Sequence, residues 1–146
     1  MGSDEWSFPR KTILVDFDGT LGPFCFPGLP DKPYDGVVAG MNRLRELGFT
    51  IVIFTTRAWP GWKVIDGQAS YYQKLADVRS WLEKWKVPYD DVTHEKIPAM
   101  FIVDDRALNP TLHGWERIVE IVENADRSDP YGRVRVAKED ADASKA

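Results

Sequence analysis

The chain has 146 residues, enough for one domain with a single hydrophobic core, and 43% hydrophobic with 29% charged residues is an ordinary globular composition. Its net charge of −4 and the absence of a basic run argue against tight, non-specific binding to nucleic acid. Cys25 is the single cysteine, which excludes an internal disulfide, and no apolar run suits a membrane span or a secretory signal. We therefore expect a soluble, cytoplasmic protein that does not bind membranes.

The first half of the chain predicts a strand, a loop, a helix and a second strand. Residues 12–15 form a short run of strand-forming residues without polar alternation, typical of a strand covered on both faces. Residues 22–35 hold four prolines and predict an ordered loop. Apolar residues recur at helical spacing over 36–47, and Gly48 is placed to end that helix in a left-handed conformation. Residues 49–54 predict a second buried strand.

The second half predicts two more helices and a third strand. An amphipathic pattern spans residues 71–86, and the short irregular segment after it could hold a minor strand near Val87 or Val92. The apolar residues 100–103 predict the third strand. The Asn-Pro pair that begins residues 109–124 supplies an N-cap and a first-turn proline for the last helix.

This alternation of strands and helices predicts an α/β fold. We expect a three-layer α/β/α sandwich around a mostly parallel, Rossmann-like sheet. Residues 1–126 would form a single catalytic domain, and residues 127–146 a polar C-terminal tail. Within the tail, residues 133–136 predict at most a short edge strand.

Polar side chains follow each of the three predicted strands, and the carboxyl ends of parallel strands meet at one edge of a sheet. Four carboxylates brought together there would need a shared cation to stay ionised, and all-oxygen ligands suit Mg²⁺. No Cys/His cluster favours zinc. The candidate metal ligands are Asp16, Asp18, Asp104 and Asp105.

Simpler interpretations compete with a metal site. An Asp-x-Asp pair can be a turn or a helix cap, but Asp16 and Asp18 end a buried strand and precede a Gly-Thr pair, which favours a functional role. Asp104 and Asp105 could cap the next helix, although Asn109 already provides that cap. The threonines after the second strand are ordinary strand residues.

Four short sequences resemble the motifs of the haloacid dehalogenase-like (HAD-like) superfamily. They are DFDGT, FTTR, HEKIPA and IVDDRA, which together span about residues 12–108. The resemblance is greatest to the small phosphatases with a DxDGT first motif. It implies that Asp16 is the nucleophile, which forms an aspartyl-phosphate, and that Asp18 is the general acid and base.

The remaining motifs add further expected roles. The resemblance implies that Thr55 and Lys96 contact the phosphoryl group, with Lys86 as a competing candidate for the motif lysine. It also implies that Asp104 and Asp105 are the acids of the fourth motif, which bind Mg²⁺.

The segments between the motifs leave no room for an inserted cap domain, so the resemblance is to capless members of the superfamily. Their lid is built from loops or from a second subunit, as a homo-oligomer would provide. Aromatic loop residues could stack on a nucleobase or pack as loop core, and both interpretations stay open. The expected substrate-binding residues are Thr56, Arg57, Trp59, Trp62 and Arg106.

The sequence thus predicts a Mg²⁺-dependent phosphomonoester hydrolase that acts on a phosphorylated substrate such as a nucleotide or a sugar phosphate. A catalytically silent phosphate-binding or scaffold domain of the same fold is one alternative. A phosphatase of nucleic-acid ends is another, although the acidic charge and the lack of a basic stripe disfavour it.

Overall fold

The chain divides into two compact units, Met1–Asp105 and Arg106–Ala146, and each is described by itself. The predicted single domain over residues 1–126 stays a prediction. No helix in the described part of the chain is long and apolar enough to cross a membrane. The computed structural model describes three segments: residues 11–25, 28–61 and 71–125.

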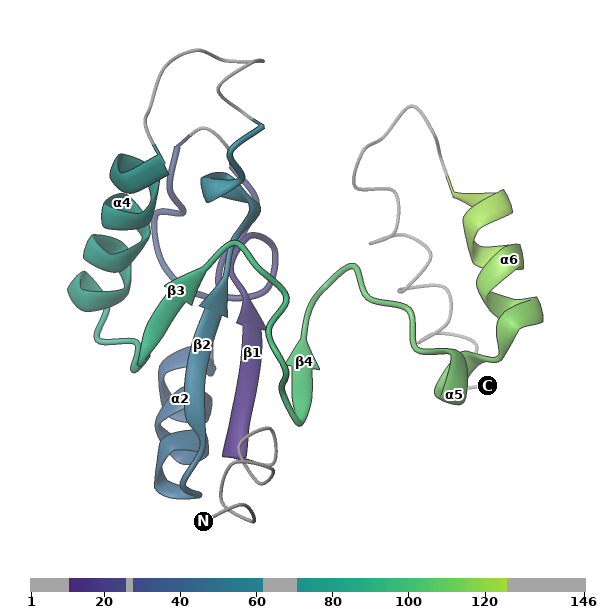
Figure 1. Ribbon diagram of the computed structural model, residues 1–146, viewed down its shortest axis with the longest axis horizontal. Helices are drawn as coiled ribbons and strands as arrows, with labels where there is room; N and C mark the ends of the chain where they lie inside the picture. Colours follow the sequence, from purple (N-terminus) through teal and green to yellow (C-terminus); the bar gives the residue numbers. More distant parts are fainter. Residues whose placement is uncertain (1–10, 26–27, 62–70, 126–146) are drawn as a thin grey trace. The chain divides into compact units, whose positions relative to one another are not determined.

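The first unit is built on a four-stranded sheet in which every neighbouring pair is parallel (Figure 1). The strand order is β3-β2-β1-β4. This sheet confirms the predicted α/β class with a parallel, Rossmann-like sheet. It also places the minor strand near Val92 rather than Val87. The strands are β1 (Thr12–Asp16), β2 (Thr50–Phe54), β3 (Asp91–Thr93) and β4 (Phe101–Val103).

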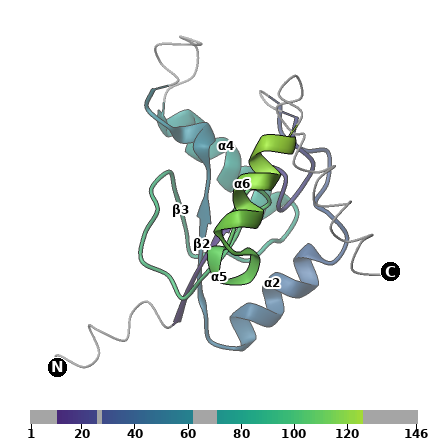
Figure 2. The same cartoon turned by 90° about the vertical axis from the view of Figure 1, so that its right-hand side faces the viewer.

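Two helices connect the strands, α2 (Val37–Glu46) after β1 and α4 (Tyr71–Lys84) after β2. Both connections step along the sheet in the same direction, and right-handed crossovers then place both helices on one face. Figure 2 shows α2 to one side of the strands. Gly48 has the predicted left-handed conformation, with a φ of 90°, and follows Leu47, the C-cap of α2. The core between helices and sheet includes Ile13, Val15, Phe17, Met41, Ile51, Ile53, Val78, Trp81 and Leu82.

The second unit corrects one predicted helix. Residues 109–124 form two helices, α5 (Pro110–His113) and α6 (Trp115–Asn124), instead of one. The break falls at Gly114, whose φ of 78° lies outside the helical region and interrupts the backbone hydrogen-bond ladder. The predicted cap is confirmed, because the Asn109 side chain accepts a hydrogen bond of 2.9 Å from the Thr111 N–H. The strand predicted at residues 133–136 lies outside the described residues.

β4 is the least covered strand of the sheet. Among the described residues it pairs with β1 alone, so it forms an edge. Its side chains are 53% exposed at Phe101, 43% at Ile102 and 41% at Val103, whereas Leu14 of β1 is buried. Asp104 and Asp105, which follow β4 within the first unit, therefore lie at an edge of its sheet.

Candidate functional site

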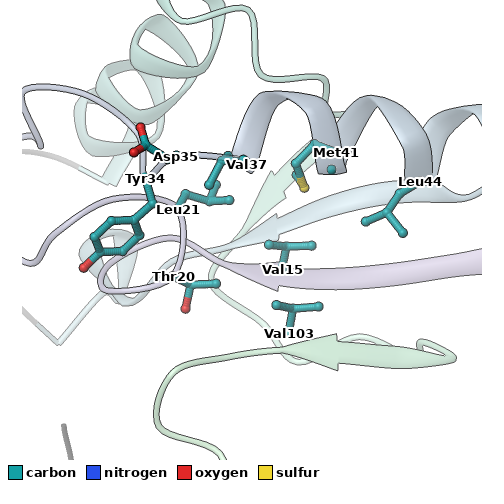
Figure 3. Close-up of a pocket in the computed structure, with 11 residues that line it drawn as sticks. Val15, Thr20, Leu21, Tyr34, Asp35, Val37, Met41, Leu44 and Val103 are labelled. Atoms are coloured by element: carbon teal, nitrogen blue, oxygen red, sulfur yellow. The ribbon is translucent and has the colours of Figure 1, made fainter. Parts of the chain in front are cut away.

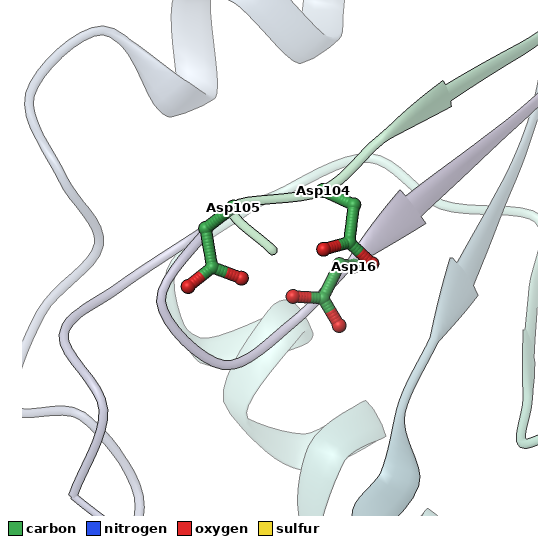
Figure 4. Close-up of side chains that lie close together, drawn as sticks. All are labelled: Asp16, Asp104 and Asp105. Carbon is green, nitrogen blue, oxygen red and sulfur yellow. The ribbon is translucent and has the colours of Figure 1, made fainter. Parts of the chain in front are cut away.

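Three carboxylates meet where β1 and β4 end. The two strands are parallel neighbours with Val15 paired to Val103, so Asp16 and Asp104 come next along adjacent strands. Carboxylate oxygens of Asp16, Asp104 and Asp105 all lie within 4.8 Å of one another. Figure 4 shows the three side chains gathered at the strand ends. The structure therefore brings together three of the four predicted metal ligands.

The Gly-Thr pair of the first motif holds this acidic cluster in place. Thr20 Oγ1 donates a hydrogen bond of 3.0 Å to Asp16 Oδ2 and accepts one of 3.1 Å from the backbone N–H of Asp105. Gly19 has a φ of 80°, and a Cβ at this position would collide with the Asp105 carboxylate. The turn after β1 thus favours glycine and uses one hydroxyl to join the ends of two strands.

The electrostatics of the cluster favour a cation. Burial, followed by the negative charge of Asp104 and a hydrogen bond with Asp105, raises the pKa of Asp16 to about 8. A carboxylate in that position is anionic at neutral pH only when positive charge is near. The three acids supply oxygen ligands alone, which fits a hard divalent cation.

Asp18 lies outside this cluster, in a buried ion pair with Arg57. Arg57 Nε donates hydrogen bonds of 2.9 and 3.1 Å to the two carboxylate oxygens, and Nη2 donates one of 2.7 Å to Oδ1. The side chains of Arg57 and Asp18 are only 6% and 11% exposed. Asp18 was predicted to bind the metal ion and Arg57 to bind substrate, but in this structure the two side chains pair with each other.

The threonines that follow β2 differ in exposure. Thr55 is fully buried, its N–H donates to the Thr93 carbonyl (2.9 Å), and its Oγ1 accepts from the Arg57 N–H (3.1 Å). It therefore caps the short 3₁₀ turn η2 (Thr56–Ala58), which carries Arg57. Thr56 is exposed at the start of that turn.

The two candidate lysines lie at opposite ends of the sheet. Lys86 follows α4 with a φ of 57° and its N–H donates to the Glu83 carbonyl, so it closes that helix on the side where β3 begins. Lys96 is exposed in the loop that leaves the carboxyl end of β3. Topology therefore favours Lys96, although it forms no ion pair with any carboxylate of the described segments.

The residues predicted to form the lid or bind substrate lie in separate parts of the chain. Trp59 is 50% exposed directly after η2, and an added Cβ at Gly61 would collide with its ring. Trp62 lies outside the described residues. Arg106 begins the second unit. Of the predicted substrate-binding residues, Thr56, Arg57 and Trp59 thus belong to one short segment after β2.

An apolar pocket of about 490 Å³ lies next to the acidic cluster (Figure 3). Thr20, which binds Asp16, lines it, as do Val15 and Val103. The N-terminal half of α2 contributes Val37, Gly40 and Met41.

Two contacts at this site were not predicted from the sequence. The first is the hydrogen bond from the Thr20 hydroxyl to the acidic cluster. The sequence does contain a signal for it, because a tight turn after Asp16 brings the fourth residue along the chain back to the Asp16 carboxylate. The pairing of Arg57 with Asp18 has a weaker signal. Arg57 is one cation at an edge with four carboxylates, and the sequence does not say which of them it binds.

Among the comparisons with known proteins, the match to the Bacteroides thetaiotaomicron structure supports the fold. No family model and no curated protein matches the chain. A structure described as a conserved protein from Bacteroides thetaiotaomicron matches with 18% identity and a TM-score of 0.51, over 84% of this chain and 95% of that one. A crystal structure of a target protein from Vibrio cholerae matches with 29% identity and a TM-score of 0.45, over 77% and 94%. Neither description names an activity.

Proposed function

We propose that this protein is a Mg²⁺-dependent phosphomonoester hydrolase of the HAD-like superfamily, which forms an aspartyl-phosphate on Asp16. The observation that carries the proposal is the meeting of Asp16, Asp104 and Asp105 at the ends of β1 and β4. The hydroxyl of Thr20, from the DxDGT sequence, links Asp16 to Asp105. The parallel sheet supports the proposal, because ligands of such sheets bind at the carboxyl ends of the strands.

Asp16, Asp104 and Asp105 would hold the metal ion, while Arg57 holds Asp18 apart from them. A bound Mg²⁺ would supply positive charge that neutralises the phosphoryl oxygens. The ionisation of Asp16 supports this assignment. Its pKa of about 8 would leave the nucleophile mostly protonated at neutral pH, and positive charge in the cluster would make it anionic.

The chemistry then follows from the two motif aspartates. A carboxylate oxygen of Asp16 attacks phosphorus while the bond from phosphorus to the leaving oxygen breaks and Asp18 gives that oxygen its proton. Water next attacks the phosphorus of the aspartyl-phosphate and gives a proton to Asp18. Inorganic phosphate leaves, and the Asp16 carboxylate is restored.

Lys96 would reach the phosphoryl oxygens from the loop after β3. Thr55 is fully buried and caps η2, so its proposed contact with the phosphoryl group would require its hydroxyl to become accessible when substrate binds. The substrate would be a nucleotide or a sugar phosphate in the cytoplasm. Trp59, half exposed after η2, and a second subunit are the candidate parts of a lid.

Phosphate release from a panel of nucleotides, sugar phosphates and p-nitrophenyl phosphate tests this function. We expect Mg²⁺-dependent release by the wild-type protein that excess EDTA abolishes and added Mg²⁺ restores. Asp16→Asn, which keeps the shape but removes the nucleophile, should reduce release to background. Turnover that persists in excess EDTA, or in Asp16→Asn, would contradict the proposal.

A catalytically silent phosphate-binding domain is the second candidate, and one observation favours it. Arg57 engages Asp18, and Thr55 is fully buried, so both residues have internal partners in this structure. This candidate predicts that inorganic phosphate binds in the presence of Mg²⁺ while no ester on the panel is hydrolysed. Isothermal titration calorimetry alongside the release assay separates the two functions.

A further inference from the structure

The guanidinium of Arg57 is fixed by several partners at once. Besides the three hydrogen bonds to Asp18, its Nη2 donates one of 2.7 Å to the carbonyl of Gly28. Its carbon atom Cζ lies 5.5 Å from the centre of the Phe17 ring. One guanidinium therefore joins the end of β1, the turn after β2 and the loop that contains Gly28.

The residues around Arg57 are also tied together by contacts of their own. The Phe17 ring packs edge-on against Trp81 of α4, with ring centres 5.1 Å apart. Trp81 Nε1 in turn donates a hydrogen bond of 2.7 Å to the Pro30 carbonyl, which fastens the same loop to α4. Because its guanidinium is held by these contacts, Arg57 is better placed to orient the neighbouring Asp18 side chain than to bind an incoming substrate.

Other arginine–aspartate pairs of the first unit are of a different kind. Arg45 contacts Asp90, and Arg79 contacts Asp91, each through one hydrogen bond at the surface, with the arginine side chains 43% exposed. Exposed pairs contribute little to stability. The pair at Arg57 is instead buried and bidentate, a geometry that fixes the orientation of a carboxylate.

We infer that Arg57 is a positioning residue, which holds the carboxyl group of Asp18 in the orientation for proton transfer to the leaving group. The proton that Asp18 gives is the one it received from the water that hydrolysed the preceding aspartyl-phosphate. This inference rests on the proposed function and replaces the expected role of Arg57 in substrate binding. In the first step the proton of Asp18 passes to the leaving oxygen as the bond between phosphorus and that oxygen breaks. Arg57 neither gives nor takes a proton, and it acts only through the placement of Asp18.

The test compares two esters that differ in their need for a proton donor. An alkyl phosphate needs protonation of its leaving oxygen, whereas p-nitrophenyl phosphate needs little. The value of kcat/KM covers the steps up to phosphoenzyme formation, so it isolates the step in which the leaving group departs. We expect Arg57→Ala to lower kcat/KM about 10²-fold or more for the alkyl ester and less than about 10-fold for the nitrophenyl ester.

Three further variants make the result specific. Asp18→Asn should show the same selective loss, and adding Arg57→Ala to it should not change the ratio between the two esters. Arg57→Lys keeps the charge without the bidentate contact, so it should fall between the wild-type protein and Arg57→Ala. If Arg57→Ala fails to fold, the comparison of the two esters can still be made with Arg57→Lys. Arg79→Ala, which removes a surface pair, should leave both values unchanged.

An equal loss on both esters in Arg57→Lys and Arg57→Ala would overturn the inference, because general disruption affects both alike. A rise in KM for both esters at constant kcat would also overturn it, since that result indicates substrate binding by Arg57. A wild-type protein that releases phosphate from neither ester would instead refute the proposed function, and the positioning role would fall with it.

Discussion

At the residue scale, Asp16 has a strongly shifted pKa within the acidic cluster. Burial and the neighbouring acids raise its pKa from 3.8 to about 8 in the folded protein without a cation. The folded state therefore holds the proton more tightly than the unfolded state does. This contribution to stability is complete below about pH 4 and is lost as the pH rises through about 8.

A pH series with and without Mg²⁺ measures that contribution. In EDTA, the melting temperature of the wild-type protein should fall between pH 5 and pH 8.5 relative to that of Asp16→Asn, which has no proton to lose at this position. Added Mg²⁺ competes with the proton, so it should raise the melting temperature more at pH 8.5 than at pH 5. Equal stabilisation by Mg²⁺ in Asp16→Asn and in the wild-type protein would place the ion elsewhere.

A substitution at Gly19 tests whether the turn after β1 holds the acidic cluster together. Gly19→Ala would place a Cβ against the Asp105 carboxylate at a φ of 80°. Gly36 is a matched control, because its φ is 87° but nothing lies within 4 Å of an added Cβ. Both variants should lose about 1–2 kcal/mol of unfolding free energy to backbone strain. In urea denaturation Gly19→Ala should lose more, and it alone should weaken Mg²⁺ binding.

At the scale of elements, Trp81 connects α4 to the loop that Arg57 also contacts. Trp81→Phe keeps an aromatic ring but removes the 2.7 Å hydrogen bond to the Pro30 carbonyl. We expect a loss of about 1–3 kcal/mol in unfolding free energy, because a buried carbonyl is left unsatisfied. The matched control is Trp85→Phe, since Trp85 Nε1 is buried and has no hydrogen-bond partner among the described residues. Similar losses in the two variants would show that ring packing, and not the hydrogen bond, fastens the loop.

The sequence predicted elements well where local signals agree. The strand-forming run that begins at Thr12, the asparagine cap at position 109 and the left-handed Gly48 each depend on neighbours in the chain. The helix predicted over 109–124 was wrong because Gly114, one residue within an otherwise helical pattern, has a φ of 78°. A sequence pattern does not reveal which conformation such a glycine takes.

At the scale of the whole molecule, the candidate site depends on which strands are neighbours. The parallel pairing of β1 with β4 brings Asp16 to Asp104 and Asp105 across some 90 residues, and the general rule for parallel sheets predicts that meeting. The partner of Asp18 could not be predicted in this way. Its pairing with Arg57 depends on the direction of a side chain leaving a 3₁₀ turn, which the strand order does not determine.

The covalent intermediate is the most direct test of the proposed function. On the proposed mechanism, Asp18→Asn keeps the nucleophile but lacks the base that activates water, so p-nitrophenyl phosphate with Mg²⁺ should phosphorylate the protein and the adduct should accumulate. Mass spectrometry of the acid-quenched variant should find one phosphate on Asp16, which hydroxylamine removes and which Asp16→Asn does not form. A phosphate on any other residue, or an unmodified protein that still releases p-nitrophenolate, would contradict the account.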